Sequence, residues 1–167
     1  MKNVFAFSYR EFKNLPIDFS NTAIIEIVGK NDVENSFVYN SDNVCRIIAD
    51  DVDGGRWISQ NNLDILFDKF INNRMNYDNN KFIHNDIVAL DYQEAEKVVK
   101  FIDEAMNDSK IDNIFIHCSA GQSRSQAIVR YIKDIYYYIN TRDDNPCLTP
   151  NMWIVMMLKR VYRIINY

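Results

Sequence analysis

A strand-like segment, a nine-residue loop and a helix-like segment follow one another between residues 111 and 135, and this succession strongly constrains the fold. Residues 111–116 are short, apolar and rich in isoleucine, which is typical of a buried strand. Residues 126–135 repeat apolar side chains at helical spacing. The loop between them has the sequence His-Cys-Ser-Ala-Gly-Gln-Ser-Arg-Ser. Where a strand turns into a helix in this way, backbone N–H groups point toward a common centre and favour a bound anion.

Five residues give this loop its predicted chemistry. Cys118 lies at a helix N-terminus near Arg124, a setting that favours the nucleophilic thiolate. The guanidinium of Arg124 is a planar fork that can bind two oxygens of one phosphate group. Gly121 allows a backbone conformation that a β-carbon would hinder. Ser125 can donate its hydroxyl to the thiolate, and His117 is expected to brace the loop rather than to transfer protons.

The rest of the loop is predicted to bind phosphate mainly through its backbone, because successive N–H groups can curl around three phosphate oxygens. A chance occurrence of this His, Cys, Gly, Arg and Ser pattern has odds on the order of one in 10⁴–10⁵. The predicted substrate-binding residues are Ser119, Ala120, Gly121, Gln122, Ser123, Arg124 and Ser125.

The loop resembles the signature His-Cys-x5-Arg-Ser/Thr of the cysteine-dependent protein tyrosine phosphatases, most closely the small dual-specificity branch of bacteria and phages. Residues 95–132 carry this resemblance best. Residues 22–28 are similar to an early strand of that family, and Pro150 and Asn151 are similar to the start of its last helix. The resemblance implies a phosphocysteine intermediate, with no metal ion and no cofactor.

Phosphate ester cleavage also needs an acid that protonates the leaving oxygen and then acts as a base on water. In the family a loop aspartate has this role. We favour Asp51, because its segment is similar to the family's Phe-Asp-Asp-Ile and its strand is expected to lie beside that of Cys118. Asp86 is the alternative, since it precedes Cys118 by 32 residues, a spacing usual in small dual-specificity phosphatases. Asp50 and Asp53 stay open. The predicted catalytic residues are therefore Cys118, Arg124 and Asp51.

Length and composition predict one domain over residues 1–167. A chain of 167 residues with 47% hydrophobic residues can bury a sizeable core. Strand-like and helix-like segments alternate, which predicts an α/β fold with a mainly parallel central sheet flanked by helices, as in dual-specificity phosphatases. If Asp51 is the acid, residues 55–84 are an insertion. Its helix and Asn-rich loop could form a lid or a wall of the substrate site, or a surface helix without such a role.

The expected elements can be given by residue range. Strands are expected at 4–7, 22–28 and 43–49, and helices at 8–12 (capped by Ser8), 59–73, 91–107 (capped by Asp91) and from Pro150 to the end (capped by Thr149). Residues 140–149 are expected to form a loop.

Charge and cysteine content indicate which partners and which cellular compartment to expect. The net charge of −4 is well mixed along the chain, which gives no indication of a nucleic-acid or membrane partner. The three cysteines form no CxxC pair, which favours a reducing compartment. The N-terminal residues lack a signal-peptide pattern and no apolar run reaches about 18 residues. These features predict a cytoplasmic protein, expected to be a monomer.

The predicted function is a phosphomonoester hydrolase of the protein tyrosine or dual-specificity type, acting on a phosphorylated protein. A non-protein substrate, such as a phosphoinositide, an RNA 5′-phosphate or a nucleotide, is less favoured because residues 119–123 carry no basic side chain. A phosphate-binding pseudophosphatase is a further alternative, but the chain retains both Cys118 and Arg124.

Overall fold

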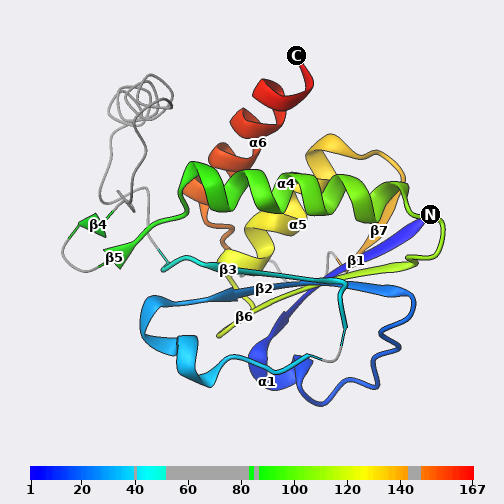
Figure 1. The fold of residues 1–167 in the computed structure, drawn as a ribbon, viewed down its shortest axis with the longest axis horizontal. Coiled ribbons are helices and arrows are strands. Elements are labelled where there is room, and N and C mark those ends of the chain that lie inside the picture. The colour runs from blue at the N-terminus through cyan, green and yellow to red at the C-terminus, as the bar shows by residue number, and fades with distance from the viewer. Residues whose placement is uncertain (40, 52–82, 85–86, 143–147) are drawn as a thin grey trace.

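Five parallel strands form the centre of the protein, in the order β3-β2-β6-β1-β7 (Figure 1). The computed structural model describes residues 1–39, 41–51, 83–84, 87–142 and 148–167. The strands of the sheet are β1 (Lys2–Ser8), β2 (Thr22–Val28), β3 (Val44–Ile48), β6 (Asn113–Cys118) and β7 (Ile139–Thr141). A separate antiparallel pair consists of β4 (Ile83–His84) and β5 (Ile87–Val88). The predicted α/β fold with a mainly parallel sheet is therefore confirmed.

Helices lie on both faces of this sheet (Figure 1). The long helices α4 (Tyr92–Asn107), α5 (Arg124–Ile135) and α6 (Met152–Asn166) cover one face. The short helix α1 (Tyr9–Phe12) and the 3-10 helix η1 (Lys30–Asn35) lie on the other. The predicted helix at 59–73 and most of the predicted insertion at 55–84 lie outside the described residues.

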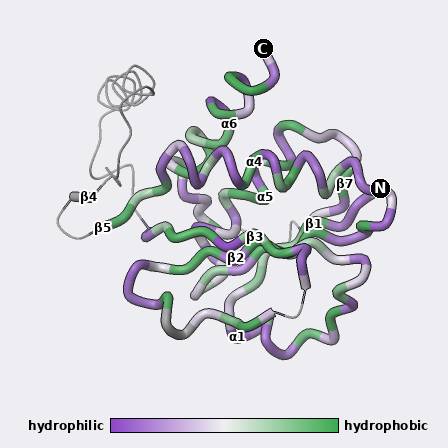
Figure 2. The backbone as a smooth tube through the Cα atoms, in the orientation of Figure 1, coloured by the Kyte–Doolittle hydropathy of each residue, from purple (hydrophilic) through white to green (hydrophobic). Residues whose placement is uncertain are grey.

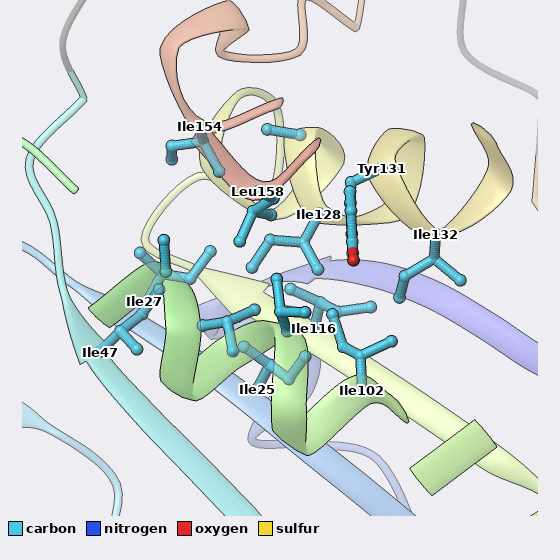
Figure 3. Packing of buried hydrophobic residues seen from close by; sticks show 14 of the residues in the cluster. Ile25, Ile27, Ile47, Ile102, Ile116, Ile128, Tyr131, Ile132, Ile154 and Leu158 are labelled. Carbon is cyan, nitrogen blue, oxygen red and sulfur yellow. The ribbon is translucent and has the colours of Figure 1, made fainter. Parts of the chain in front are cut away.

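The larger hydrophobic core fills the space between the sheet and the three long helices. Figure 2 shows hydrophobic stretches along the central strands, whereas the helices alternate between hydrophobic and hydrophilic turns. Figure 3 shows Ile116 of β6 close to Ile128 of α5, with Leu158 of α6 nearby. A smaller cluster around Phe7 and Phe12 lies on the opposite face.

Side chains of a strand alternate between the two faces of a sheet. Ile114, Ile116 and Cys118 belong to the core beneath the long helices. His117 stacks instead on Phe12 of α1, on the opposite face. The last two residues of β6 therefore belong to different layers, although they are neighbours in the chain.

Local capping signals in the sequence are confirmed at two helices. Ser8 caps α1 with a reciprocal capping box to Glu11. The Asp91 side chain accepts from the Glu94 N–H and begins α4, which ends at Asn107.

Two predicted boundaries near the C-terminus are wrong. Helix α6 begins at Met152 and is capped by Asn151, whose side chain accepts from the Ile154 N–H, so Thr149 is not the cap. The predicted loop at 140–149 also contains the end of β7, which pairs with β1. Three residues are too few to show strand periodicity, so only pairing with β1 reveals this strand.

The expected neighbour of β6 is also different. Strand β2 lies between β3 and β6, so the strand before Asp51 is not adjacent to that of Cys118. All seven residues of β2 are buried, and an inner position with a partner on each side suits such a strand. Strand β3 alternates between buried and half-buried residues and takes the edge.

Candidate active site

The loop between β6 and α5 packs against the end of β1. In the parallel register, Ser8 of β1 lies opposite Cys118, and the Tyr9 N–H donates to the Ser119 carbonyl at 3.2 Å. Gly121 has φ +72°, and a β-carbon there would lie 2.4 Å from the Ser8 nitrogen. Both the left-handed backbone and this close approach require glycine.

Cys118 lies at the floor of the loop with only 2% of its surface exposed. Its sulfur lies 3.3 Å from the Ser125 hydroxyl, and the Gly121 N–H donates to the same sulfur at 3.3 Å. In this arrangement the Cys118 thiol donates to the Ser125 hydroxyl and accepts from the Gly121 N–H. The same hydroxyl can donate in turn to the sulfur once the thiol has lost its proton.

Arg124 extends from the first turn of α5 back across the loop, and only 7% of it is exposed. One terminal nitrogen donates to the Ala49 carbonyl at 2.9 Å, and the other donates to the Ser119 hydroxyl. The Nε atom is buried and has no hydrogen-bond partner among the described residues. A buried charged donor without a partner is costly, so this side chain is suited to an anion that the site receives.

The N-terminus of α5 is likewise prepared for an anion. Ser123 occupies the N-cap position, yet its hydroxyl donates to Asp51 at 2.7 Å and makes no capping hydrogen bond to the helix. The first N–H groups of a helix need acceptors and carry the positive end of its dipole. An anion held in the loop would supply those acceptors.

Of the four candidate aspartates, the structure places Asp51 against the loop. Its Oδ1 atom accepts from the Ser123 hydroxyl and from the Asn151 side-chain amide, both at 2.7 Å. Asp50 instead binds backbone, accepting from the N–H groups of Lys30 at 3.0 Å and Val88 at 2.7 Å. These bonds use both oxygens of Asp50 to hold neighbouring loops. Asp53 and Asp86 lie outside the described residues.

Gly29, which follows the last residue of β2, lies beside the loop after β3. A β-carbon at Gly29 would lie 3.1 Å from Asp50 Oδ1 and 3.6 Å from the Arg124 guanidinium. Arg124 passes the same glycine and donates to the Ala49 carbonyl in the loop after β3. Asp51, the predicted acid, thus contacts the loop after β6 although β2 lies between its own strand, β3, and β6.

A row of polar side chains, with Glu26 and His117 buried and Arg46 partly exposed, lies beneath the loop on the face of the sheet that carries α1. Glu26 of β2 is fully buried and stands in register with Arg46 on one side and His117 on the other. The Glu26 carboxylate accepts from Arg46 and, at 3.0 Å, from the Phe37 N–H. Its charge is thereby neutralised within the protein.

His117 is fixed by its surroundings. Its Nε2 atom is hydrogen-bonded to the Tyr39 hydroxyl, and its ring stacks on Phe12 with centroids 4.1 Å apart. Burial, assisted by the positive charge of Arg46, lowers the pKa of His117 to about 4. The ring is therefore neutral at pH 7, which suits the bracing role expected from the sequence.

A pocket of about 250 Å³ opens beside Cys118. Tyr9, Arg10 and Asp32 line it together with Val28. No pattern in the sequence points to these residues, because they lie far from the loop in the chain and have no motif of their own. Only the shared edge of the parallel sheet brings them to the thiol.

Comparison of the chain with protein-family models, with curated proteins and with solved structures finds no match in any of the three.

Two negative findings apply to the described part of the chain. It contains no cluster of three or more His, Cys, Asp or Glu side chains that could hold a metal ion. It also contains no helix that is both long and apolar enough to cross a bilayer.

The lowered pKa of His117 predicts a stability change with pH. An unfolded histidine has a pKa of about 6.5, so between pH 6.5 and about 4 only the unfolded chain binds this proton. The stabilisation is complete above pH 6.5 and is lost as the pH falls through this range, by at most about 3 kcal/mol. Denaturant unfolding at pH 7, 5.5 and 4 should show a steeper loss for wild type than for His117→Asn. Parallel losses in the two proteins would contradict it.

Proposed function

We propose that this protein is a phosphomonoester hydrolase of the protein tyrosine phosphatase superfamily, with a small dual-specificity-like fold. The single observation that carries the proposal is the buried Arg124 guanidinium, whose Nε atom lacks a partner among the described residues, in one loop with the buried Cys118 thiol. A phosphate group bound there would satisfy the arginine and the α5 N-terminus and bring its phosphorus to the sulfur.

In the first step, the Cys118 thiolate attacks phosphorus and forms a P–S bond while the ester P–O bond breaks. Arg124 and the loop N–H groups stabilise charge on the three equatorial oxygens. The leaving oxygen takes a proton from Asp51, whose carboxyl group lies against the loop through Ser123.

In the second step, Asp51 accepts a proton from water as the water oxygen attacks phosphorus. The P–S bond breaks, its electron pair returns to the Cys118 sulfur, and inorganic phosphate is released. The Ser125 hydroxyl, 3.3 Å from this sulfur, can donate to the departing thiolate. Gly121 N–H supports the same charge. Each cycle restores the starting protonation of the thiolate and the acid.

The pocket beside Cys118 supports a phosphotyrosine side chain of a protein as substrate. An apolar cavity of about 150 Å³ admits a benzene ring, and this pocket has a volume of about 250 Å³. Cys118, only 2% exposed, is among the residues that line this pocket. Val28 and Tyr9 can contact a ring, while Arg10 and Asp32 offer charges to flanking residues.

Replacing the nucleophile tests the reaction directly. Cys118→Ser should abolish hydrolysis of an aryl phosphate but keep phosphate binding, because Arg124 and the loop N–H groups remain. Hydrolysis and binding of inorganic phosphate by calorimetry should be measured on the same preparation. Hydrolysis by Cys118→Ser at the wild-type rate would contradict the proposal.

Alkylation provides a control within the same chain. Iodoacetate should inactivate wild type near neutral pH by labelling Cys118 before Cys45, because burial raises the pKa of the Cys45 thiol to about 11. Peptide mapping identifies the modified residue. Equal labelling of the two thiols would count against a stabilised Cys118 thiolate.

Arg124→Lys tests the fork-like binding of phosphate. Lysine retains the charge but cannot bind two oxygens in one plane, so kcat should fall by about 10²–10⁴-fold. Steady-state kinetics on an aryl phosphate measures this fall in kcat, and circular dichroism checks that the variant is folded. Activity within a few-fold of wild type would show that charge alone suffices.

The identity of the acid can be tested through the leaving group. A poor leaving group needs the proton, whereas an activated one departs without it. Asp51→Asn should therefore slow hydrolysis of a phosphopeptide or alkyl phosphate strongly and that of an activated aryl phosphate much less. It should also flatten the basic limb of the pH–rate profile.

The matched control is Asp86→Asn, which should leave both properties unchanged. If the leaving-group dependence arises in Asp86→Asn instead, Asp86 is the acid and the insertion at 55–84 is wrongly placed.

A further inference from the structure

Asn151 joins three segments of the chain at the edge of the site. It is 5% exposed and caps α6, where its side-chain oxygen accepts from the Ile154 N–H at 3.1 Å. Its backbone N–H donates to the Ser123 carbonyl in the signature loop at 3.2 Å. Its side-chain nitrogen donates to Asp51 at 2.7 Å.

The capping bond fixes which way the Asn151 amide points. A backbone N–H can only donate, so the atom facing Ile154 must be the amide oxygen. The NH₂ group therefore faces Asp51, and it can only donate. The orientation does not depend on the protonation state of the aspartate.

Both donors to Asp51 reach the same oxygen. The Ser123 hydroxyl and the Asn151 amide each lie 2.7 Å from Oδ1. An oxygen that accepts from an NH₂ group is a poor place for a proton, so a proton on this carboxyl group belongs on Oδ2. The two bonds thereby decide which oxygen can deliver it.

Helix α6 gives Asn151 a rigid base. Next to it, Trp153 is 3% exposed and its indole N–H donates to the Leu90 carbonyl at 2.9 Å. Leu158, one and a half turns further, is fully buried in the core. Asp51, which ends the described part of its loop, is thus held by a helix anchored in the core.

We propose that Asn151 is a positioning residue for the general acid: it holds the Asp51 carboxyl group with Oδ2 directed to the leaving oxygen and couples the C-terminal helix to the reaction. This role rests on the proposed phosphatase function. Asn151 does not touch the substrate, so its removal should affect only steps in which Asp51 transfers a proton.

Two replacements keep the helix cap and change the contact with Asp51. Serine is a good N-cap but too short to reach Asp51 while capping. Asn151→Ser should slow phosphopeptide hydrolysis about tenfold and an activated aryl phosphate by less than about twofold.

Aspartate is also a good N-cap and has the same size as asparagine. Asn151→Asp puts a second carboxylate against Asp51, and neighbouring like charges favour the protonated form. The basic limb of the pH–rate profile should move to higher pH by about one unit.

The control for capping itself is Asp91→Ser, at the N-cap of α4, whose side chain accepts from the Glu94 N–H. It should leave the ratio of the two substrate rates unchanged, and thermal unfolding of all variants checks the fold.

A double replacement separates positioning from a structural role. In an Asp51→Asn background the acid is absent, so adding Asn151→Ser should produce no further loss on the phosphopeptide. An additional loss there, or an equal loss on both substrates in the single variant, would show that Asn151 only supports the loop. If wild type hydrolyses neither substrate, the proposed function itself fails.

Discussion

The buried guanidinium of Arg124 is the interaction on which the arrangement of the site depends. It donates to the Ala49 carbonyl after β3 and to the Ser119 hydroxyl in the loop after β6. These loops belong to strands separated by β2, so the Arg124 side chain joins them across the end of that strand. The same guanidinium keeps one buried donor for an incoming anion among the described residues. The Arg124 side chain therefore joins the two loops and, in the proposed reaction, also binds phosphate. Bound phosphate would supply the acceptor that its Nε atom lacks among the described residues.

The two faces of β6 support the proposed nucleophile in different ways. Cys118 faces the core beneath the long helices, while His117 belongs to the polar row that also contains Glu26 and the partly exposed Arg46. In that row the buried Glu26 carboxylate is paired with Arg46 and accepts from the Phe37 N–H, which limits the cost of burying its charge. Neutral His117 sits at the end of the row, bound to Tyr39. The loop is thus supported by apolar packing on one face and by a satisfied polar network on the other.

Contacts to Asp51 explain how a residue that follows an edge strand is held at the central loop. Ser123 belongs to that loop, and Asn151 is the N-cap of α6. Both bonds reach the same oxygen. A carboxyl group held in this way keeps its orientation without being part of a rigid strand, which is what a proton donor requires. Asp50, one residue earlier, is instead used to fasten the loop to its neighbours.

The sequence by itself determined the features that depend on local spacing. The strand, loop and helix around Cys118 follow from apolar periodicity, and Gly121 from the tight turn between them, because these patterns are written over a few consecutive residues. Capping by Ser8 and Asp91 follows for the same reason.

Tertiary structure alone decided the rest. The place of β2 between β3 and β6, the pairing of β7 with β1, and the contact of Asn151 with Asp51 join residues up to 137 positions apart. Local patterns carry no information on such pairs, since the free energy that selects them comes from burying whole strands and helices against one another. The sequence was sufficient to predict which residue types form the site, whereas the fold determined how they are oriented toward one another.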